Sequence, residues 1–212
     1  MGDLFAAPGA VLEIAPGAVL LRSFAAARAD GLKAALADVA RAAPFRNMVT
    51  PGGFTMSVAM TNCGAYGWIS DETGYRYAPL DPASGRPWPA LPPVLADLAR
   101  RAAAAAGFAG FAPDACLVNR YVPGARLTLH QDRNECDMTQ PIVSVSLGVP
   151  ATFLFGGVTR KERPARLALE HGDVVVWGGP ARLRYHGVAP LKTGHHPFAG
   201  PDRINLTLRR AL

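Results

Sequence analysis

The sequence is poor in cysteine, and this scarcity disfavours two kinds of stabilised domain. Its 212 residues include 3 cysteines, an odd number, and no two of them have the C-x-x-C spacing of a zinc site. A disulfide framework and a cysteine-based metal site are therefore not expected. Unpaired thiols suit a reducing compartment, so we expect a cytoplasmic protein.

Long apolar runs are also missing. The N-terminal stretch lacks a basic segment and is interrupted by Pro8, Glu13 and Pro16. We therefore expect neither a signal peptide nor a membrane-spanning helix. No internal repeat and no exposed heptad pattern is present, and we expect a monomer without membrane attachment.

Lysine is scarce as well, with Lys33, Lys161 and Lys192, so the net charge of +6 comes almost wholly from arginine. A guanidinium binds phosphates and carboxylates through two parallel hydrogen bonds, which indicates an anionic partner. Nucleic acid is one such partner, although a charge excess of this size also occurs on proteins that never contact it. Half of the residues are apolar, which excludes a disordered chain.

The length fits a single domain over residues 1–212. Apolar residues recur at helical spacing from Leu32 to Ala43, and again from about Pro92 to Ala106 before Gly107. Between these predicted helices, the chain is dense in glycine, proline and aromatic residues, which favours short strands and loops. We divide the domain into an N-terminal extension with the first helix, a strand-and-loop segment, the second helix and a core, over residues 1–44, 45–90, 91–110 and 111–212.

The core segment predicts a mainly β fold (α+β class). Its short apolar runs are separated by glycine- and proline-containing turns, as in an antiparallel sandwich or barrel. A jelly roll with both helices on one outer face is the leading candidate. The predicted strands are Ala115–Tyr121, Arg126–Asp132, Ile142–Gly148, Thr152–Phe155, Arg166–Glu170, Asp173–Trp177, Leu183–Val188 and Arg203–Arg209.

Two metal-ligand side chains lie at the end of the second core strand. His130 and Asp132 are two residues apart, so on a strand they point to the same side. His186 lies on a later strand. Two imidazoles and one carboxylate on one face of a metal leave three positions open, as a non-haem Fe(II) oxygenase requires for a bidentate co-substrate and O₂.

Other histidines compete for this role on composition alone. His171 lies in a Glu-His-Gly-Asp turn, where capping or surface exposure explains it, and His195 and His196 lie in a loop bounded by glycine and proline. A lone H-x-D is common in proteins. The strand that follows His186 is what favours the first set.

That strand, Arg203–Arg209, alternates polar and aliphatic residues, so its polar side chains share one face. A solvent-facing row is the ordinary explanation. Alternatively, its two arginines, roughly 20 Å apart along the strand, reach the two ends of a small dicarboxylate. Asn119 and Tyr121 share one parity on a neighbouring strand and are further hydrogen-bonding candidates.

Together these motifs resemble the AlkB family of nucleic-acid repair dioxygenases. The order H-x-D, single His, R-x-N-x-T-x-R carries the resemblance, which extends over nearly the whole chain. The other matching segments are Met48–Gly53, Ser57–Gly64, Pro113–Cys116, Pro141–Gly148 and Glu170–Gly179. The resemblance implies a double-stranded β-helix core and an Fe(II)- and 2-oxoglutarate-dependent enzyme that uses O₂ to remove alkyl groups from bases.

The resemblance also implies the roles of individual residues. Iron would be bound by His130, Asp132 and His186. Arg203 would bind the distal carboxylate of 2-oxoglutarate and Arg209 would lie near its C1 carboxylate. The residues that assist would be Asn119, Tyr121 and Asn205.

For the substrate, the resemblance makes residues 45–90 a nucleotide-recognition lid. Trp68 and His130 would enclose the flipped base. The other implied contacts with the base or the DNA backbone are Thr50, Met60, Tyr75, Arg126, Gln131, Arg133, Asn134, Glu135 and Arg160. The tripeptide Arg133-Asn134-Glu135 stands where a bacterial member of the family has Lys-Asp-Glu. Because Asn134 lacks a carboxylate, the ranking of 1-methyladenine and 3-methylcytosine is left open.

Alkylated single-stranded DNA is the expected substrate, with double-stranded DNA and RNA as further candidates. Two other functions stay open. The same dioxygenase chemistry on a protein, lipid or small molecule is one, because jelly-roll oxygenases share the metal triad. A non-catalytic cupin-like binding domain is the other, and it predicts no succinate release.

Overall fold

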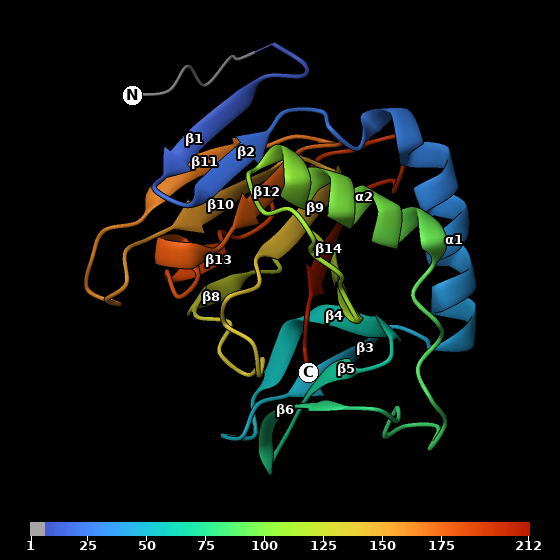
Figure 1. Cartoon of the computed structure of the whole chain (residues 1–212). Helices are drawn as coiled ribbons and strands as arrows, with labels where there is room; N and C mark the ends of the chain where they lie inside the picture. The colour runs from blue at the N-terminus through green and yellow to red at the C-terminus, as the bar shows by residue number, and fades with distance from the viewer. Residues whose placement is uncertain (1–6) are drawn as a thin grey trace.

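The computed structural model describes residues 7–212, so the first six residues of the predicted extension lie outside the described part. Two facing β-sheets form its centre (Figure 1). The larger has 8 strands in the order β1 (Val11–Ala15), β2 (Ala18–Leu21), β12 (Val174–Trp177), β9 (Ile142–Gly148), β14 (Arg203–Arg209), β7 (Ala115–Tyr121), β4 (Thr55–Gly64) and β3 (Arg46–Val49). The smaller has 4, in the order β11 (Ala165–Leu169), β10 (Ala151–Phe155), β13 (His186–Val188) and β8 (Leu127–His130).

The predicted jelly roll is confirmed. All eight predicted core strands form, and they divide equally between the two sheets, with antiparallel neighbours throughout. Strands β7, β9 and β14 have the predicted bounds. Strands β8 and β13 are shorter than predicted, because β8 ends at His130 and its partner β13 begins only at His186.

Both predicted helices form and lie side by side on the outer face of the larger sheet (Figure 1). Helix α1 (Ala29–Ala42) buries Leu32, and α2 (Pro93–Ala105) buries Leu98 in the same apolar cluster as Val143 and Leu206 of the sheet. A proline at the first position of α2 is favourable, because a backbone N–H at that position would have no carbonyl acceptor within the helix, so proline loses no hydrogen bond by lacking one. Neither helix within residues 7–212 combines the length and apolarity needed to cross a bilayer.

The N-terminal half contributes more to the sheet than its sequence pattern suggests. Strand β2 pairs with β12, and β4 pairs with β7 at the other side of the same sheet. Only the hairpin of β5 (Gly67–Asp71) and β6 (Gly74–Ala78) forms a separate two-stranded sheet. The segment 45–90 therefore consists of two strands of the main sheet and one hairpin that lies beside the opening of the jelly roll.

Candidate active site

The pairing of β8 with β13 brings two histidines together. His130 and His186 are direct cross-strand partners, and their ring centroids are 4.5 Å apart. Gly187, next to His186, makes this approach possible, because a Cβ placed there would lie 2.7 Å from the carbonyl oxygen of Leu127. Any larger residue would push β13 away from β8.

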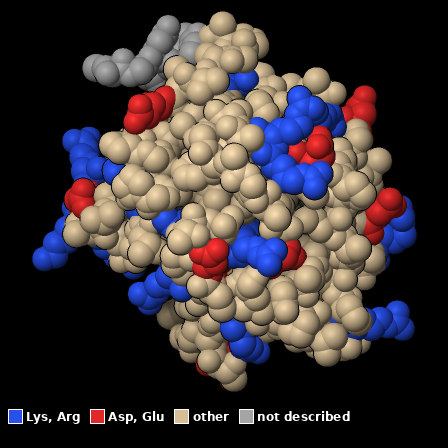
Figure 2. Space-filling view, viewed as in Figure 1, with Lys and Arg blue, Asp and Glu red and all other residues tan. Residues whose placement is uncertain are grey.

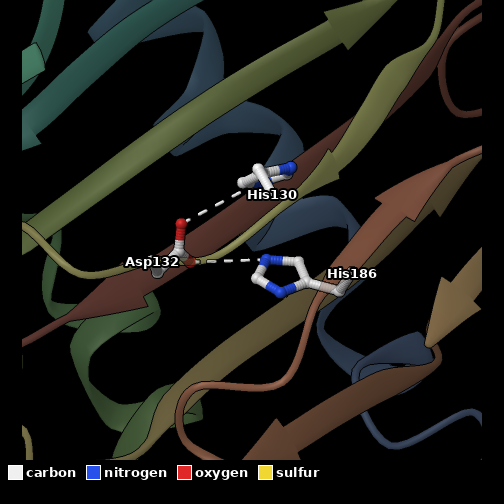
Figure 3. A group of neighbouring side chains, drawn as sticks. All are labelled: His130, Asp132 and His186. Atoms are coloured by element: carbon white, nitrogen blue, oxygen red, sulfur yellow. Dashed lines mark ion pairs between the residues drawn. The ribbon is translucent and has the colours of Figure 1, made fainter. Parts of the chain in front are cut away.

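Asp132 completes the group from the loop that follows β8, and not from the strand itself as predicted. Its Oδ1 lies 3.8 Å from Nε2 of His130, and its Oδ2 lies 3.6 Å from Nε2 of His186 (Figure 3). One potential ligand atom from each residue lies within 4.8 Å of the other two. Two imidazoles and a carboxylate thus converge on one point, as a facial metal site requires.

Backbone contacts orient both imidazoles. Nδ1 of His130 lies 2.8 Å from the carbonyl oxygen of Thr128, and Nδ1 of His186 lies 3.1 Å from that of Arg184. An Nδ1–H that donates to a carbonyl leaves the Nε2 lone pair free for a metal. Burial and the neighbouring His186 lower the pKa of His130, which favours the neutral form that binds metals.

Asp132 is held as a carboxylate by an arginine. Arg209 donates hydrogen bonds to Oδ2 of Asp132 from Nε, at 3.1 Å, and from Nη2, at 2.6 Å. Burial by itself would raise the pKa of Asp132, but the guanidinium outweighs it and keeps that pKa well below its usual range. The carboxylate oxygens of Asp132, which are the candidate metal ligands, therefore carry a negative charge at neutral pH.

The polar row of β14 points into the space between the sheets, so the solvent-facing explanation is wrong. Its four polar side chains are all at most 6% exposed. With side chains from β7 and β9 they line a small internal cavity of about 40 Å³ next to the histidines. The predicted co-substrate residues that line it are Asn119, Tyr121, Arg203, Asn205 and Arg209.

Arg203 shows what this cavity is suited to bind. Its Nη2 donates to Oγ of Ser146 at 3.0 Å, but Nε and Nη1 are buried without a hydrogen-bond partner among the described residues. A buried guanidinium with unpaired N–H groups is costly unless an anion joins it. One carboxylate of a small diacid accepts two parallel hydrogen bonds from such a group. The donor set therefore fits 2-oxoglutarate.

A second, open cavity of about 520 Å³ adjoins the metal-ligand group. It brings together His130, Asp132 and Arg209 with eight of the ten predicted substrate residues, namely Thr50, Met60, Trp68, Tyr75, Gln131, Arg133, Asn134 and Arg160. Arg126 and Glu135 do not line it. Arg126 is exposed at the turn before β8, whereas Glu135 is buried. The substrate roles of all ten stay predictions.

The wall of this cavity is aromatic on one side. Trp68 on β5 and Tyr75 on β6 stack with their centroids 5.6 Å apart and their planes 14° apart. Nε1 of Trp68 donates to Oδ1 of Asn134 at 3.4 Å. The hairpin therefore presents flat rings to the cavity and contacts the loop that carries the metal carboxylate.

The charge around the cavity differs from that on the helical face. On the face that carries the helices, acidic and basic side chains alternate (Figure 2). Asp97, for example, lies 3.8 Å from both Arg28 and Arg100. Arg133 and Arg160 at the open cavity make no ion pair within residues 7–212. Uncompensated positive charge is thus present where a polyanion would enter.

Sequence reasoning missed several polar residues of the site. Ser144 lines the small cavity, and Ser146 contacts Arg203. The alternation Val-Ser-Val-Ser in β9 could have identified the serines, because alternate residues of a strand share a face. Tyr77 and Arg182, which contact the metal-ligand loop from outside its own segment, left no signal in the sequence.

Comparison with known proteins gives consistent matches. The family model described as the 2OG-Fe(II) oxygenase superfamily matches residues 17–209. The alpha-ketoglutarate-dependent dioxygenase AlkB of Salmonella typhimurium is 59% identical over all of this chain and 98% of its own length. The nucleic acid dioxygenase ALKBH1 of Mus musculus is 40% identical over 46% of this chain and 25% of its own. The solved structure of OsALKBH1 covers 95% of this chain and 100% of its own, with a TM-score of 0.81 and 29% identity.

Proposed function

Because the chain belongs to the 2OG-Fe(II) oxygenase superfamily and, within it, to the AlkB family, we propose that it oxidatively demethylates alkylated bases in nucleic acid. Its cofactors are Fe(II), the co-substrate 2-oxoglutarate (alpha-ketoglutarate) and O₂. The observation that carries the proposal is one open cavity in which His130 and Asp132 of the His-Asp-His group meet an aromatic wall and two arginines, Arg133 and Arg160, that make no ion pair within residues 7–212. A flat base on a phosphate backbone matches all three features.

The protein side chains would hold the cofactors in two adjacent places. His130, Asp132 and His186 would bind Fe(II) through Nε2 and carboxylate oxygens. Arg203 would bind the distal carboxylate of 2-oxoglutarate with its unpaired nitrogens, and Arg209 would lie near the C1 carboxylate. The hydrogen-bonding residues would be Asn119, Tyr121 and Asn205. When bound, iron and 2-oxoglutarate use O₂ to oxidise the N-methyl carbon, yielding formaldehyde, succinate and CO₂.

The aromatic wall would select and orient the base. Trp68 and His130 would enclose it, with Tyr75 and Met60 beside it. N1-methyladenine and N3-methylcytosine are cationic, and aromatic faces attract cations. An alkylated base also pairs poorly, so moving it out of a helix costs less than for a normal base. These features support 1-methyladenine and 3-methylcytosine as the lesions removed.

The backbone of the nucleic acid would lie along the arginines at the opening. Arg133 and Arg160 border the cavity, and Arg126 is exposed near it. Their charges suit phosphates of any sequence. We favour single-stranded DNA, because it needs no unpairing, with double-stranded DNA and RNA as further substrates. We also propose that the protein acts as a monomer in the cytoplasm, where its three free thiols would stay reduced.

Succinate formation tests this proposal. The protein would be supplied with Fe(II), ascorbate, O₂ and 2-oxoglutarate, with either a methylated oligonucleotide or an unmethylated one of the same sequence. We expect the methylated strand to accelerate succinate release. Equal, slow release with both strands would keep the dioxygenase and point to a protein, lipid or small-molecule substrate. No release from protein that binds iron would favour a non-catalytic binding domain.

A further inference from the structure

A buried cluster of four charges lies behind the metal-ligand carboxylate. Arg182 and Arg209 supply the positive charges, and Asp132 and Glu135 the negative ones. Nη2 of Arg182 lies 2.9 Å from Oε2 of Glu135, and Nε of Arg209 lies 3.4 Å from Oε1. No side chain of the four is more than 9% exposed. The charges balance, and removal of any one would leave a net charge buried in the cluster.

Glu135 is fully engaged within this cluster. In addition to both arginines, its Oε1 accepts a hydrogen bond from the hydroxyl of Tyr77 at 2.6 Å. Its side chain is 2% exposed and does not line the open cavity. To contact a base, as the family resemblance implies, Glu135 would have to break these contacts and uncover two buried guanidiniums. Its surroundings therefore indicate a different role.

Tyr77 connects Glu135 to the hairpin of the cavity wall. It lies on β6 directly opposite Trp68 of β5, two residues from Tyr75. Burial raises the pKa of Tyr77, so its hydroxyl stays protonated and is a hydrogen-bond donor to the carboxylate. The same hydroxyl accepts a longer hydrogen bond from Nη1 of Arg209, at 3.4 Å. The aromatic wall is thus attached to the charge cluster through Tyr77 by two side-chain hydrogen bonds, of which the one to Glu135 is the shorter.

Arg182 holds the other side of the loop. It donates from Nη1 to the carbonyl oxygen of Asp132 at 2.7 Å and from Nε to that of Gln140 at 3.0 Å. The same guanidinium binds Glu135, so both ends of the segment 132–140 and its middle are fixed to one side chain. Movement of Glu135 would therefore displace Asp132.

From these contacts we propose that Glu135 is a positioning residue that couples the β5–β6 hairpin to the metal-ligand Asp132. The connection runs from Tyr77 through Glu135 to Arg209 and Asp132. This proposal depends on the proposed function in one respect, which is that the hairpin takes part in substrate binding. Binding of metal at Asp132 should then order the hairpin, and loosening of the hairpin should weaken the site.

Two conservative variants test this coupling, each with a matched control. Glu135→Gln keeps the size of the side chain and removes its charge, and exposed Glu72→Gln on the same hairpin is its control. Tyr77→Phe removes one hydroxyl, and Tyr66→Phe is its control. The readouts are affinity for Mn(II) without 2-oxoglutarate, hydrogen exchange over residues 67–78, and kcat and KM with a methylated oligonucleotide.

We expect Glu135→Gln to weaken Mn(II) binding about tenfold, as loss of a residue that supports a metal ligand does. Both variants should speed hydrogen exchange in the hairpin, and neither control should. Tyr77→Phe should raise the oligonucleotide KM about tenfold and lower kcat less, because it loses the short hydrogen bond to Glu135 and the longer one from Arg209. The double variant should raise KM no more than the larger single effect, since both act through the same contact.

Different results would overturn the coupling. Glu135 would be a substrate contact if Glu135→Gln matched Glu72→Gln in Mn(II) affinity and hairpin exchange while changing the ratio of 1-methyladenine to 3-methylcytosine turnover. If Glu135→Gln fails to fold, unchanged hairpin exchange in Tyr77→Phe would refute the proposal by itself. Absence of oligonucleotide turnover in the wild type would refute the proposed function, whereas Mn(II) affinity and hydrogen exchange would still decide the coupling.

Discussion

The chemistry of this site depends on the hydrogen-bond and ion-pair partners of its individual side chains. Asp132 is charged because Arg209 lies beside it, and both histidines present Nε2 because backbone carbonyls take their Nδ1–H groups. Arg203, by contrast, is buried, and two of its nitrogens have no hydrogen-bond partner among residues 7–212. The first arrangement prepares a metal site, and the second leaves a place for an anion.

Replacement of Asp132 tests the metal site. Asp132→Ala removes the only carboxylate in the group of three ligands found among the described residues. Loss of a ligand should cost at least the roughly hundredfold that loss of a supporting residue can cost. We expect Mn(II) binding and turnover to fall together by that factor or more. Normal turnover in a variant shown to be folded by circular dichroism would refute the assignment.

Replacement of Arg203 tests the co-substrate pocket. Truncation of one partner of a buried charged pair costs about 2 kcal/mol or more, which corresponds to roughly thirtyfold. We therefore expect Arg203→Ala to raise the KM for 2-oxoglutarate about thirtyfold, with little change in Mn(II) affinity. Arg210→Ala is the control, because that arginine is exposed and pairs with Asp114. Similar KM values in the two variants would place the co-substrate elsewhere.

The candidate metal and co-substrate residues could be grouped from the sequence because all of them except Asp132 lie on strands, where alternate residues share a face. Asn205 and Thr207 of β14 were grouped in this way and do lie together. Glu135 could not be assigned from sequence. Its surroundings depend on Arg182, 47 residues later, and on Tyr77, 58 residues earlier, and no local pattern records such contacts.

At the scale of elements, the strands of the core segment were predicted one by one, whereas those of the N-terminal half were not. Strand β4 is buried continuously from Val58 to Gly64, so it shows no alternation of polar and apolar residues. Strands β1 and β2 form a hairpin that joins the larger sheet because β2 pairs with β12, which is distant in the sequence. The sequence therefore predicted the core sandwich, whereas the extent of the larger sheet depends on tertiary pairing.

The loop between β13 and β14 is held by two histidines that are outside the metal site. His171 and His196 stack with centroids 4.3 Å apart, and Nδ1 of His171 accepts the N–H of Gly148 at 3.1 Å. Burial, and then His196, lower the pKa of His171 in the folded state. Protonation is therefore easier in the unfolded chain, so the stability contributed by this pair is present above about pH 6.5 and is lost as the pH falls below it.

Urea unfolding at about pH 7.5 and about pH 5.5 tests this pair, since histidine titrates between these values. The metal-free wild type should lose more free energy of unfolding on acidification than His171→Asn, in which the amide oxygen can still accept the Gly148 N–H. Histidines that do not contact His171 contribute equally to both proteins and cancel in the comparison, whereas His196 shares in the effect because it stacks on His171. An equal loss in the two proteins would show that His171 does not titrate in this range.

At the scale of the whole molecule, the net charge of +6 matters through its distribution. The helical face carries intermixed acidic and basic side chains (Figure 2), whereas Arg133 and Arg160 at the open cavity have no acidic partner within residues 7–212. Salt should therefore weaken nucleic-acid binding through a few local contacts. Three phosphate contacts, from Arg126, Arg133 and Arg160, predict a slope of log K against log salt of about −2 for a single strand.

Single-site variants refine that slope. Arg160→Ala should make it shallower by about 0.7, the contribution of one phosphate contact. Arg101→Ala, at an exposed position of α2, should leave the slope unchanged. A slope near zero in the wild type, or equal slopes in the two variants, would contradict binding of nucleic acid at this opening.

The most direct test of the central claim is mass spectrometry of a single-stranded oligonucleotide that carries one 1-methyladenine or 3-methylcytosine. The oligonucleotide would be incubated with the protein, Fe(II), ascorbate and O₂, with and without 2-oxoglutarate. The predicted result is that the oligonucleotide loses the mass of one CH₂ group, because hydrogen replaces the methyl group, and that it does so only when 2-oxoglutarate is present. Retention of the methyl group on both lesions, while succinate is still released, would contradict the demethylation of nucleic acid.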